Sequence, residues 1–272
     1  MSPYGRSPSG GGGHRLLLHR SEPERVARLS GWVREGLALG EKVVYIEGGG
    51  FGDDVLAVLV THGIEVDAAV AQGRLEVLAP EEFYRPGGQE ALLDRVLAEG
   101  HTRLRISGEA STAYRVLSPA VHREVEDLVD RLCATRPVSA LCQYTVGSLP
   151  GAALDSVVGM HPGGLTELSL DVGEADDGLV LRGAVDFTNV EVLRASMVAA
   201  MSAAGDAVVL RVDFADVEHL AASACRAIVR AWAPSRTPGP RLVLSQVQPV
   251  VARVMRLCGV DAAGIEIVER AR

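Results

Sequence analysis

Polar side chains that could bind a ligand interrupt apolar segments in the first half of the sequence. Arg105 and Glu109 flank the end of the segment RLRISGE, and ligands of open α/β sheets collect where the strands end. Cys142 and Tyr144 alternate in LCQY, so a strand there would turn both toward one face and Gln143 toward the other. These residues are candidates for a small-molecule site. A local ion pair and a buried thiol are the structural alternative.

Histidine and cysteine residues of the same region could also ligate a metal ion. His14 precedes the first apolar run, Cys142 lies in LCQY, and His161 precedes a Pro-Gly-Gly turn. Structural zinc sites place their cysteines and histidines at short, regular separations. The separations here follow no such pattern, so the sequence predicts neither a metal site nor a cofactor.

The segment EGGGFGDD could cradle a phosphate, because it joins a predicted strand to a predicted helix. A P-loop needs a lysine directly after its last glycine, and Lys42, before the strand, is the only lysine of the chain. Asp53 replaces the third glycine of a dinucleotide-binding loop, where it would repel a pyrophosphate. We therefore expect no enzyme, and a nucleotide-binding enzyme is the least favoured alternative.

Ser223 is the residue of the second half that is best placed for regulation. It lies in LAASACRAIV, where a predicted helix follows a predicted strand. A serine at a helix start is commonly an N-cap that contributes about 1 kcal/mol. The same position favours a phosphoserine, because unpaired backbone N–H groups and the helix dipole stabilise its negative charge. The residues alone leave both roles open.

Short apolar strands that alternate with helical patterns must position these residues in the first half. The first helix has a start signal, with Ser21 as N-cap and Pro23 in the first turn. Alternation of this kind predicts βαβ units and a mainly parallel sheet. The expected strands are 15–18, 41–46, 75–78, 104–107 and 138–144, and the expected helices are 25–39, 53–62, 89–98 and 119–135.

The pattern changes at the turn His161-Pro-Gly-Gly. Two adjacent strands are followed by alternating helices and strands, which predicts a second, small α/β domain. Its expected strands are 168–171, 179–186, 208–214, 242–246 and 265–268, and its expected helices are 189–203, 223–233 and 249–258. The predicted organisation is a flexible tail at 1–13, a first domain at 14–164 and a second at 166–272.

Composition excludes several classes of protein. The chain has 272 residues, of which 47% are hydrophobic and 23% charged, as in globular rather than disordered proteins. The net charge of −8 has no basic cluster to offset it, so neither nucleic acid nor a membrane is an expected partner. The N-terminal MSPYGRSPSGGGGHR lacks the apolar core of a signal peptide, and the four cysteines form no CxxC pair. We expect a cytoplasmic protein with free thiols.

Several short motifs in the first half, in this order, resemble the MEDS sensory domain, a family named for methanogen and methylotroph regulators. They are His14, R-x-x-G-E ending at Glu109, Glu126 with Asp130, Leu-Cys-x-Tyr ending at Tyr144, and His161-Pro162. The resemblance implies a fold similar to the RecA/KaiC ATPases without their phosphate-binding motif, and a role in sensing small organic ligands. His19 and Thr145 depart from the Tyr and Asp common in the family. The ligand-binding candidates by analogy are His14, Arg105, Glu109, Glu126, Cys142, Tyr144 and His161.

The second half, residues 166–272, resembles the STAS domain of anti-sigma factor antagonists. The family's G-x-x-D strand end is matched by Gly183 and Asp186, and its strand that ends in Asp by Asp213. The segment VARVMRLCGVD matches the motif before the family's last strand. This resemblance implies a docking module for a kinase-fold protein.

Ser223 occupies the position of the serine that is phosphorylated in this family. The surrounding D-S-S-G pattern is altered, because Ala221, Ala222 and Ala224 stand at the other three positions. His219 replaces the usual aromatic residue. The partner-binding residues that the resemblance implies are Asp186, Asp213, His219, Ser223 and Arg226.

The sequence thus predicts a non-enzymatic regulator with a sensory domain and a STAS-type domain. The second domain would bind an anti-sigma factor or another serine-kinase-fold protein, and phosphorylation of Ser223 would release that partner by charge repulsion. The first domain would bind an unidentified small molecule. A docking scaffold without phosphorylation, or a homodimer element of a larger complex, is the alternative.

Overall fold

The computed structural model describes residues 13–48, 55–111, 113, 117–149, 151–204, 208–232 and 241–271. The chain divides into two compact units, Met1–Thr145 and Val146–Arg272. Most of the expected tail and residues 49–54 of the Gly-rich loop lie outside the described residues.

The first unit is built on a parallel sheet with strand order β1-β5-β4-β2-β3. Its strands are almost entirely buried, which explains why they read as continuous apolar runs rather than as alternating patterns. The mainly parallel α/β fold predicted from the sequence is confirmed. The strands are β1 (His14–His19), β2 (Lys42–Ile46), β3 (Leu75–Leu78), β4 (Leu104–Glu109) and β5 (Val138–Thr145).

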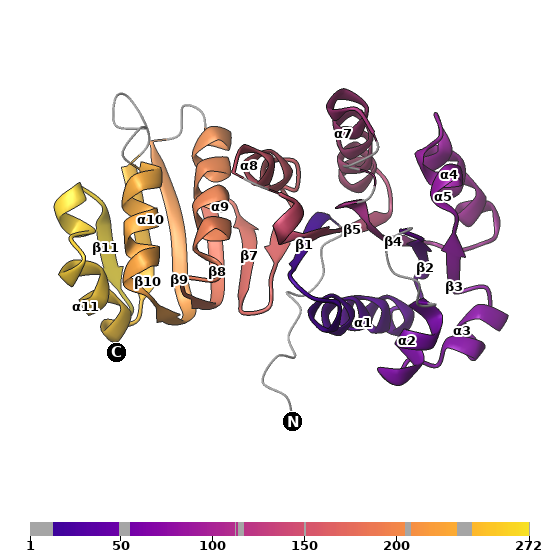
Figure 1. Ribbon diagram of the computed structural model, residues 1–272, viewed down its shortest axis with the longest axis horizontal. Coiled ribbons are helices and arrows are strands. Elements are labelled where there is room, and N and C mark those ends of the chain that lie inside the picture. Colours follow the sequence, from indigo (N-terminus) through magenta and orange to yellow (C-terminus); the bar gives the residue numbers. More distant parts are fainter. Residues whose placement is uncertain are drawn as a thin grey trace. The chain divides into compact units, whose positions relative to one another are not determined.

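Helices cover both faces of this sheet. Figure 1 shows α1, α2 and α3 on one face and α4, α5 and α7 on the other, and each layer has its own apolar core. The short α3 and α4 were not predicted. The bounds are α1 (Glu22–Ala38), α2 (Val55–Thr61), α3 (Val66–Ala71), α4 (Pro80–Tyr84), α5 (Gly88–Ala98) and α7 (Pro119–Thr135).

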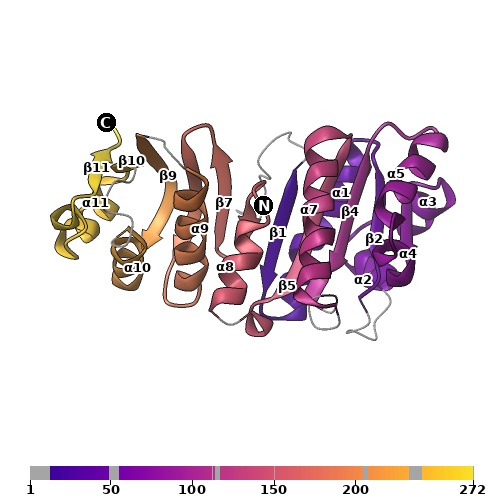
Figure 2. The ribbon, with the colours of Figure 1, turned by 90° about the horizontal axis from the view of Figure 1, so that it is seen from above.

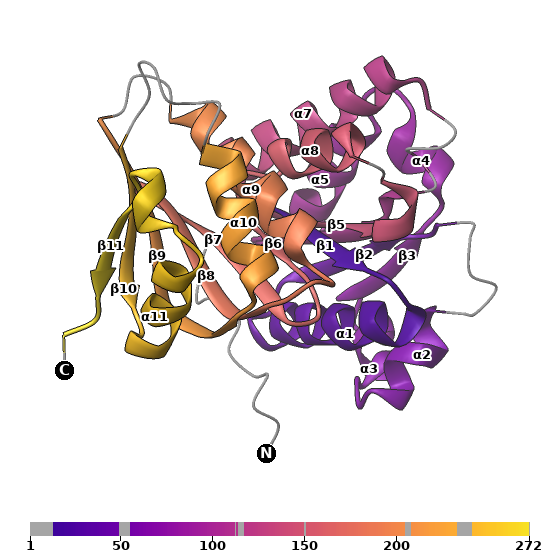
Figure 3. The same ribbon diagram turned by 60° about the vertical axis from the view of Figure 1, so that its left-hand side comes forward.

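The second unit has the strand order β11-β10-β9-β8-β7-β6. The strands from β6 to β8 are antiparallel and those from β8 to β11 are parallel. The helices α9, α10 and α11 lie along one face of this sheet (Figures 2 and 3). The strands are β6 (Leu165–Thr166), β7 (Leu170–Ala175), β8 (Gly178–Val185), β9 (Val209–Leu220), β10 (Arg241–Val247) and β11 (Glu266–Glu269), and the helices are α8 (Ala152–Gly159), α9 (Val190–Ala203), α10 (Ala222–Trp232) and α11 (Pro249–Leu257), with single 3₁₀ turns at Val146–Ser148 and Asp261–Ala263.

The helix α8 was not predicted and packs against α9 within the second unit. The two are joined by an ion pair in which Arg194 Nη2 lies 2.5 Å from Asp155 Oδ1. Hydrogen bonds from Arg194 to Asp155 and Glu191 raise the pKa of the guanidinium.

The strand β9 corrects the prediction most clearly, because it continues to Leu220 instead of ending at residue 214. Its pairing with β8 shifts register after Val180, where the partner residues pass from Asp213 to Asp216. Asp213 Oδ1 accepts a hydrogen bond from the Ala215 backbone N–H at 2.7 Å inside this irregularity. A local bulge of this kind lets a strand continue past a polar residue that would otherwise mark its end.

Among the described residues, no helix combines the length and the apolar character needed to cross a membrane.

Candidate functional site

Three polar residues of α7 face the sheet at helical spacing. His122, Glu126 and Asp130 are separated by four residues each and therefore share one side of the helix. His122 and Glu126 are each only 4% exposed, and Ser118 caps the helix by accepting a hydrogen bond from the Val121 N–H. The helix thus carries a row of titratable groups into the core.

These groups meet side chains from β1 and β5. Glu126 Oε2 lies 3.1 Å from His14 Nε2 and 3.7 Å from Cys142 Sγ, and His14 Nε2 lies 3.3 Å from that sulfur. The Tyr144 hydroxyl donates to Glu126 Oε1 at 2.5 Å, and His122 Nε2 lies 2.8 Å from the Tyr144 oxygen. We call His14, His122, Glu126, Asp130, Cys142 and Tyr144 the His14 cluster.

Electrostatics in the His14 cluster favour a protonated histidine and a neutral thiol. Burial by itself would lower the pKa of His14, but Cys142, Asp130 and Glu126 together raise it to about 12. Burial and then the Glu126 carboxylate raise the pKa of Cys142 to about 11. Burial likewise raises the pKa of Tyr144. The cluster is therefore a compact set of proton donors around one carboxylate.

The opposite face of the sheet carries a separate polar group. His19 Nε2 lies 2.9 Å from Glu109 Oε2, and the Ser111 N–H donates to the other Glu109 oxygen at 3.2 Å. Burial opposes ionisation of Glu109, but these two partners hold the pKa of its carboxyl below its usual value. Gln143 also points to this face, where its side-chain oxygen accepts from Arg25 at 3.1 Å. The predicted division of Cys142 and Tyr144 from Gln143 is thus present in the structure.

Arg105 is not part of either polar group. Its Nε donates to Glu41 at 2.5 Å and its Nη1 to Glu35 at 3.0 Å, and its guanidinium lies 4.2 Å from the centre of the Trp32 ring. These partners gather at the start of β4, whereas Glu109 ends it. The structure therefore separates Arg105 from Glu109 and places Arg105 in a buried ion pair with Glu41.

Lys42, the only lysine, is the first residue of β2, the strand that leads into the Gly-rich loop. Its side chain is buried, with Nζ 2.8 Å from Glu76 and 3.7 Å from Glu99. Burial would raise the pKa of the Glu76 carboxyl, but hydrogen bonds and charge interactions with Arg95 and Lys42 lower it.

Because Lys42 is buried and paired, its amine should resist modification in the folded chain. We expect an N-hydroxysuccinimide ester to label Lys42 at least about a hundredfold more slowly in buffer than in denaturing urea, since reaction requires the strand to open. Mass spectrometry of the peptide that contains Lys42 measures both rates, with the N-terminal amine as an internal control. Equal rates would contradict the buried position.

In the second unit, the ends of β8 and β9 bring together most of the predicted partner-binding residues. Val185 and Leu220 are register partners, and the Ala221 N–H donates to the Val185 carbonyl. Asp186 follows β8 directly, and α10 begins two residues after β9. The residues at this edge are Asp186, Phe187, His219, Ser223 and Arg226, which we call the β8–β9 edge.

The side chains at the β8–β9 edge differ in their exposure and in their hydrogen bonds. Ser223 is the second residue of α10, not its N-cap, and is half-buried, whereas His219 and Arg226 are exposed. Asp186 Oδ1 accepts from the Thr188 N–H and hydroxyl, so it shapes its own turn. Phe187, which the sequence did not single out, is 79% exposed. Asp213 is absent from this edge because β9 continues past it.

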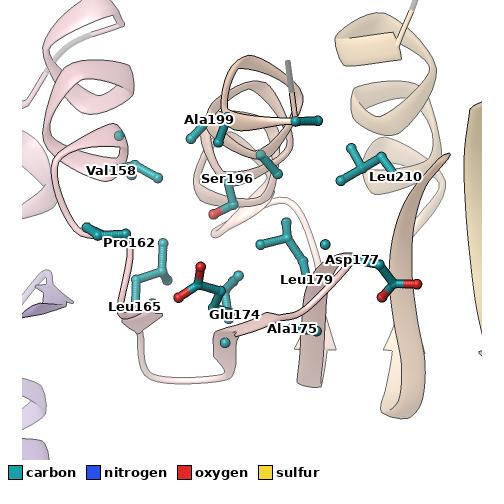
Figure 4. Close-up of a pocket in the computed structure, with 18 of the residues that line it drawn as sticks. Val158, Pro162, Leu165, Glu174, Ala175, Asp177, Leu179, Ser196, Ala199 and Leu210 are labelled. Atoms are coloured by element: carbon teal, nitrogen blue, oxygen red, sulfur yellow. The ribbon is translucent and has the colours of Figure 1, made fainter. Parts of the chain in front are cut away.

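A pocket of about 440 Å³ opens in the second unit between α8, α9 and the β7–β8 hairpin (Figure 4). Val158, Leu165, Leu179 and Leu210 contribute much of its lining, together with alanines of α9. Ser196 donates its hydroxyl to a backbone carbonyl of α9. The size and lining suit an apolar small molecule. No sequence pattern points to this pocket, because its walls come from separate segments of the second unit.

His161 also belongs to the second unit. It is buried directly after α8, and its Nδ1 lies 2.6 Å from the Val157 carbonyl oxygen. That contact fixes the orientation of the ring against the end of the helix.

Family comparisons separate the two halves of the chain. Residues 13–162 match the family model described as MEDS, the methanogen/methylotroph, DcmR sensory domain. The chain belongs to the MEDS family. Residues 168–269 match the model described as Mlab, STAS domain, so the predicted pairing of a MEDS domain with a STAS domain is confirmed. The MEDS match extends past the first unit and includes α8.

Two solved structures resemble the chain at low identity. The KaiC-like protein PH0186 of Pyrococcus horikoshii OT3 has 16% identity and a TM-score of 0.45, over 64% of this chain and 79% of its own. The flagellar accessory protein FlaH of Methanocaldococcus jannaschii has 10% identity and a TM-score of 0.43, over 63% and 77%. No curated protein matches the chain significantly.

Of the ligand-binding candidates, the MEDS core thus assembles four on one face: His14, Glu126, Cys142 and Tyr144. Sequence reasoning did not include His122 and named Asp130 only as part of a motif. The spacing H-x-x-x-E-x-x-x-D, which ends at Asp130, was the available signal, because it puts all three side chains on one side of a helix.

Proposed function

We propose that this chain is a non-enzymatic regulator in which a ligand-sensing MEDS domain is joined to a STAS domain that docks a protein partner. The proposed partner is an anti-sigma factor of the serine-kinase fold, and docking would free a sigma factor. We place this exchange in the cytoplasm, where the four free thiols of the chain would stay reduced.

The β8–β9 edge supports docking through Phe187. This side chain is 79% exposed on the turn that precedes α9. An exposed phenylalanine next to a polar side chain such as Asp186 is typical of a protein–protein contact. This exposed aromatic residue is the observation that carries the proposal.

Ser223 supports control of that docking by charge. It lies in the first turn of α10, where a phosphate would be stabilised by the helix dipole and would not disturb the fold. The same phosphate would place about two negative charges next to the contact surface and repel an acidic partner. Phosphorylation is thus proposed as the release signal.

The proposal predicts that Ser223→Asp weakens partner binding at least about tenfold, while Ser223→Ala binds like the unchanged chain. The measurement is titration calorimetry with a purified serine-kinase-fold anti-sigma factor from the same organism. Incubation of the chain with that protein and ATP, followed by phosphate mapping, tests the modification itself.

Ser202→Asp is the matched control, because it adds the same charge to an exposed serine at the far end of α9. Its affinity should be unchanged. Partner binding that is insensitive to Ser223→Asp, with no phosphate at Ser223, would favour the scaffold alternative that Ala221, Ala222 and Ala224 suggest. Absence of any binding by the unchanged chain would contradict the docking proposal.

The non-enzymatic assignment is supported by Lys42. A phosphate-binding lysine has to reach the loop after its strand, but Lys42 is engaged by Glu76 at the other end of β2. We expect no saturable binding in a titration with ATP.

A further inference from the structure

The His14 cluster contains three donor atoms of different chemistry at one point in the MEDS core. An imidazole nitrogen of His14, the sulfur of Cys142 and a carboxylate oxygen of Glu126 all lie within 4.8 Å of one another. They come from β1, β5 and α7, three elements that are packed together in the first unit. His14 and Glu126 are almost completely buried, although neither residue type is among those most often found in a protein core.

The separations of these atoms match one metal geometry. Zinc bonds to sulfur, nitrogen and oxygen are about 2.3, 2.0 and 2.0 Å, so tetrahedral angles separate the donors by about 3.3–3.6 Å. The observed distances are 3.3 Å from His14 to Cys142, 3.1 Å from His14 to Glu126 and 3.7 Å from Cys142 to Glu126. The three atoms therefore occupy three corners of a tetrahedron of the right size.

The surrounding side chains also fit a metal site. Asp130 Oδ1 lies 3.7 Å from His14 Nδ1, the ring nitrogen that faces away from the cluster centre, as in the carboxylate–histidine–metal arrangement that orients a ligating imidazole. Tyr144 holds the second oxygen of Glu126. A divalent cation would be balanced by the thiolate and the carboxylate, so the buried site would carry no net charge.

A small cavity adjoins the same residues. Its volume is about 20 Å³, and Glu126, Cys142 and Tyr84 contribute to its lining. That volume admits one water-sized molecule. It provides room for a water molecule beside Glu126 and Cys142.

We propose that His14, Glu126 and Cys142 bind one zinc-class divalent cation in the MEDS domain. Thiolate and imidazole donors select this class over magnesium and calcium, which prefer oxygen ligands. The spacing of these residues in sequence predicted no metal site, because the three ligands converge only through the fold. The inference goes beyond the proposed function and names a ligand class for the sensory domain.

Cobalt(II) is the probe that tests the site. The full chain, purified without a histidine tag and stripped with a chelator, should bind one equivalent of Co²⁺. We expect strong visible bands of tetrahedral cobalt and a thiolate-to-cobalt charge-transfer band in the near ultraviolet. Elemental analysis after loading with Zn²⁺ should give one zinc per chain.

Variants assign the ligands. Cys142→Ser should lose the charge-transfer band and at least about a hundredfold in affinity. Cys133→Ser is the matched control, because Cys133 is another buried thiol on α7 that is not one of the three donors, and it should keep the band. Asp130→Asn changes a partly exposed side chain and should weaken binding about tenfold with the band retained.

The result for the unchanged chain decides the proposal even where a variant fails to fold. Less than half an equivalent of cobalt, or a spectrum without a thiolate band, would overturn the site. These measurements report only on metal binding. A negative result would therefore not affect the proposed partner binding at the β8–β9 edge.

Discussion

Replacement of Arg105 by methionine is expected to destabilise the first unit by about 3 kcal/mol or more. Arg105 and Glu41 are both buried and form an ion pair of 2.5 Å. Removal of the cation leaves the Glu41 carboxylate in the core with one remaining partner, Arg103. The close approach depends on Gly36 of α1, where a Cβ atom would lie 2.7 Å from Arg105 Cδ.

Urea unfolding followed by the fluorescence of Trp32 measures this loss. Trp32 stacks on Arg105, and a Trp232→Phe background makes it the only tryptophan, so the signal reports the first unit. Arg103→Met is the control, because Arg103 bonds the same carboxylate from a position that is 44% exposed, and it should cost less than about 1 kcal/mol. Equal losses in the two variants would contradict the structural role of Arg105.

Gly183→Ala should destabilise the second unit by about 3 kcal/mol. Gly183 has a φ of +95°, and a Cβ atom there would lie 2.3 Å from the Ser169 backbone oxygen. Both the backbone conformation and the contact exclude a side chain, so strand β8 would have to move from β7. The loss should appear in Trp232 fluorescence during urea unfolding of chains that carry Trp32→Phe.

Gly173→Ala is the matched control for Gly183. It lies on the neighbouring strand β7, and a Cβ atom there would be 3.5 Å from its nearest neighbour, Arg182 Nη1, an ordinary contact. The free energy of unfolding should change by less than about 1 kcal/mol. A small effect at both glycines would show that the close approach of Gly183 to Ser169 is relaxed without cost.

The spacing of apolar residues, together with start and stop signals, predicts most of the long helices and strands. The first helix has its N-terminal signal at Ser21, and β2 reads as a buried strand, so α1 and β2 lie where expected. The helices α3 and α4 have six and five residues, too few for an apolar face to repeat. Because Asp213 resembles a strand end, the sequence predicts that β9 ends at residue 214, whereas a bulge accommodates Asp213 and the strand continues to Leu220.

The candidate site was predictable as a set of residues but not as an arrangement. Strand parity correctly placed Cys142 and Tyr144 on one face, where Glu126 meets both. The alternation of side chains shows which face of the sheet each residue occupies, but not how far apart two residues lie along the strand. Arg105 and Glu109 share a face but are four residues apart, about 13 Å at the rise of a strand, so each found partners at its own end of β4.

The helix α8 has a consequence for dissecting the chain into fragments. The MEDS family match ends at residue 162 and includes α8, but α8 is anchored on α9 through Asp155 and Arg194. A gene fragment cut at the family boundary would therefore carry an amphipathic helix away from its packing surface. The segment that matches the family model and the compact unit of the structure therefore end at different residues. Fragments made to study the MEDS domain alone should be compared with the full-length chain.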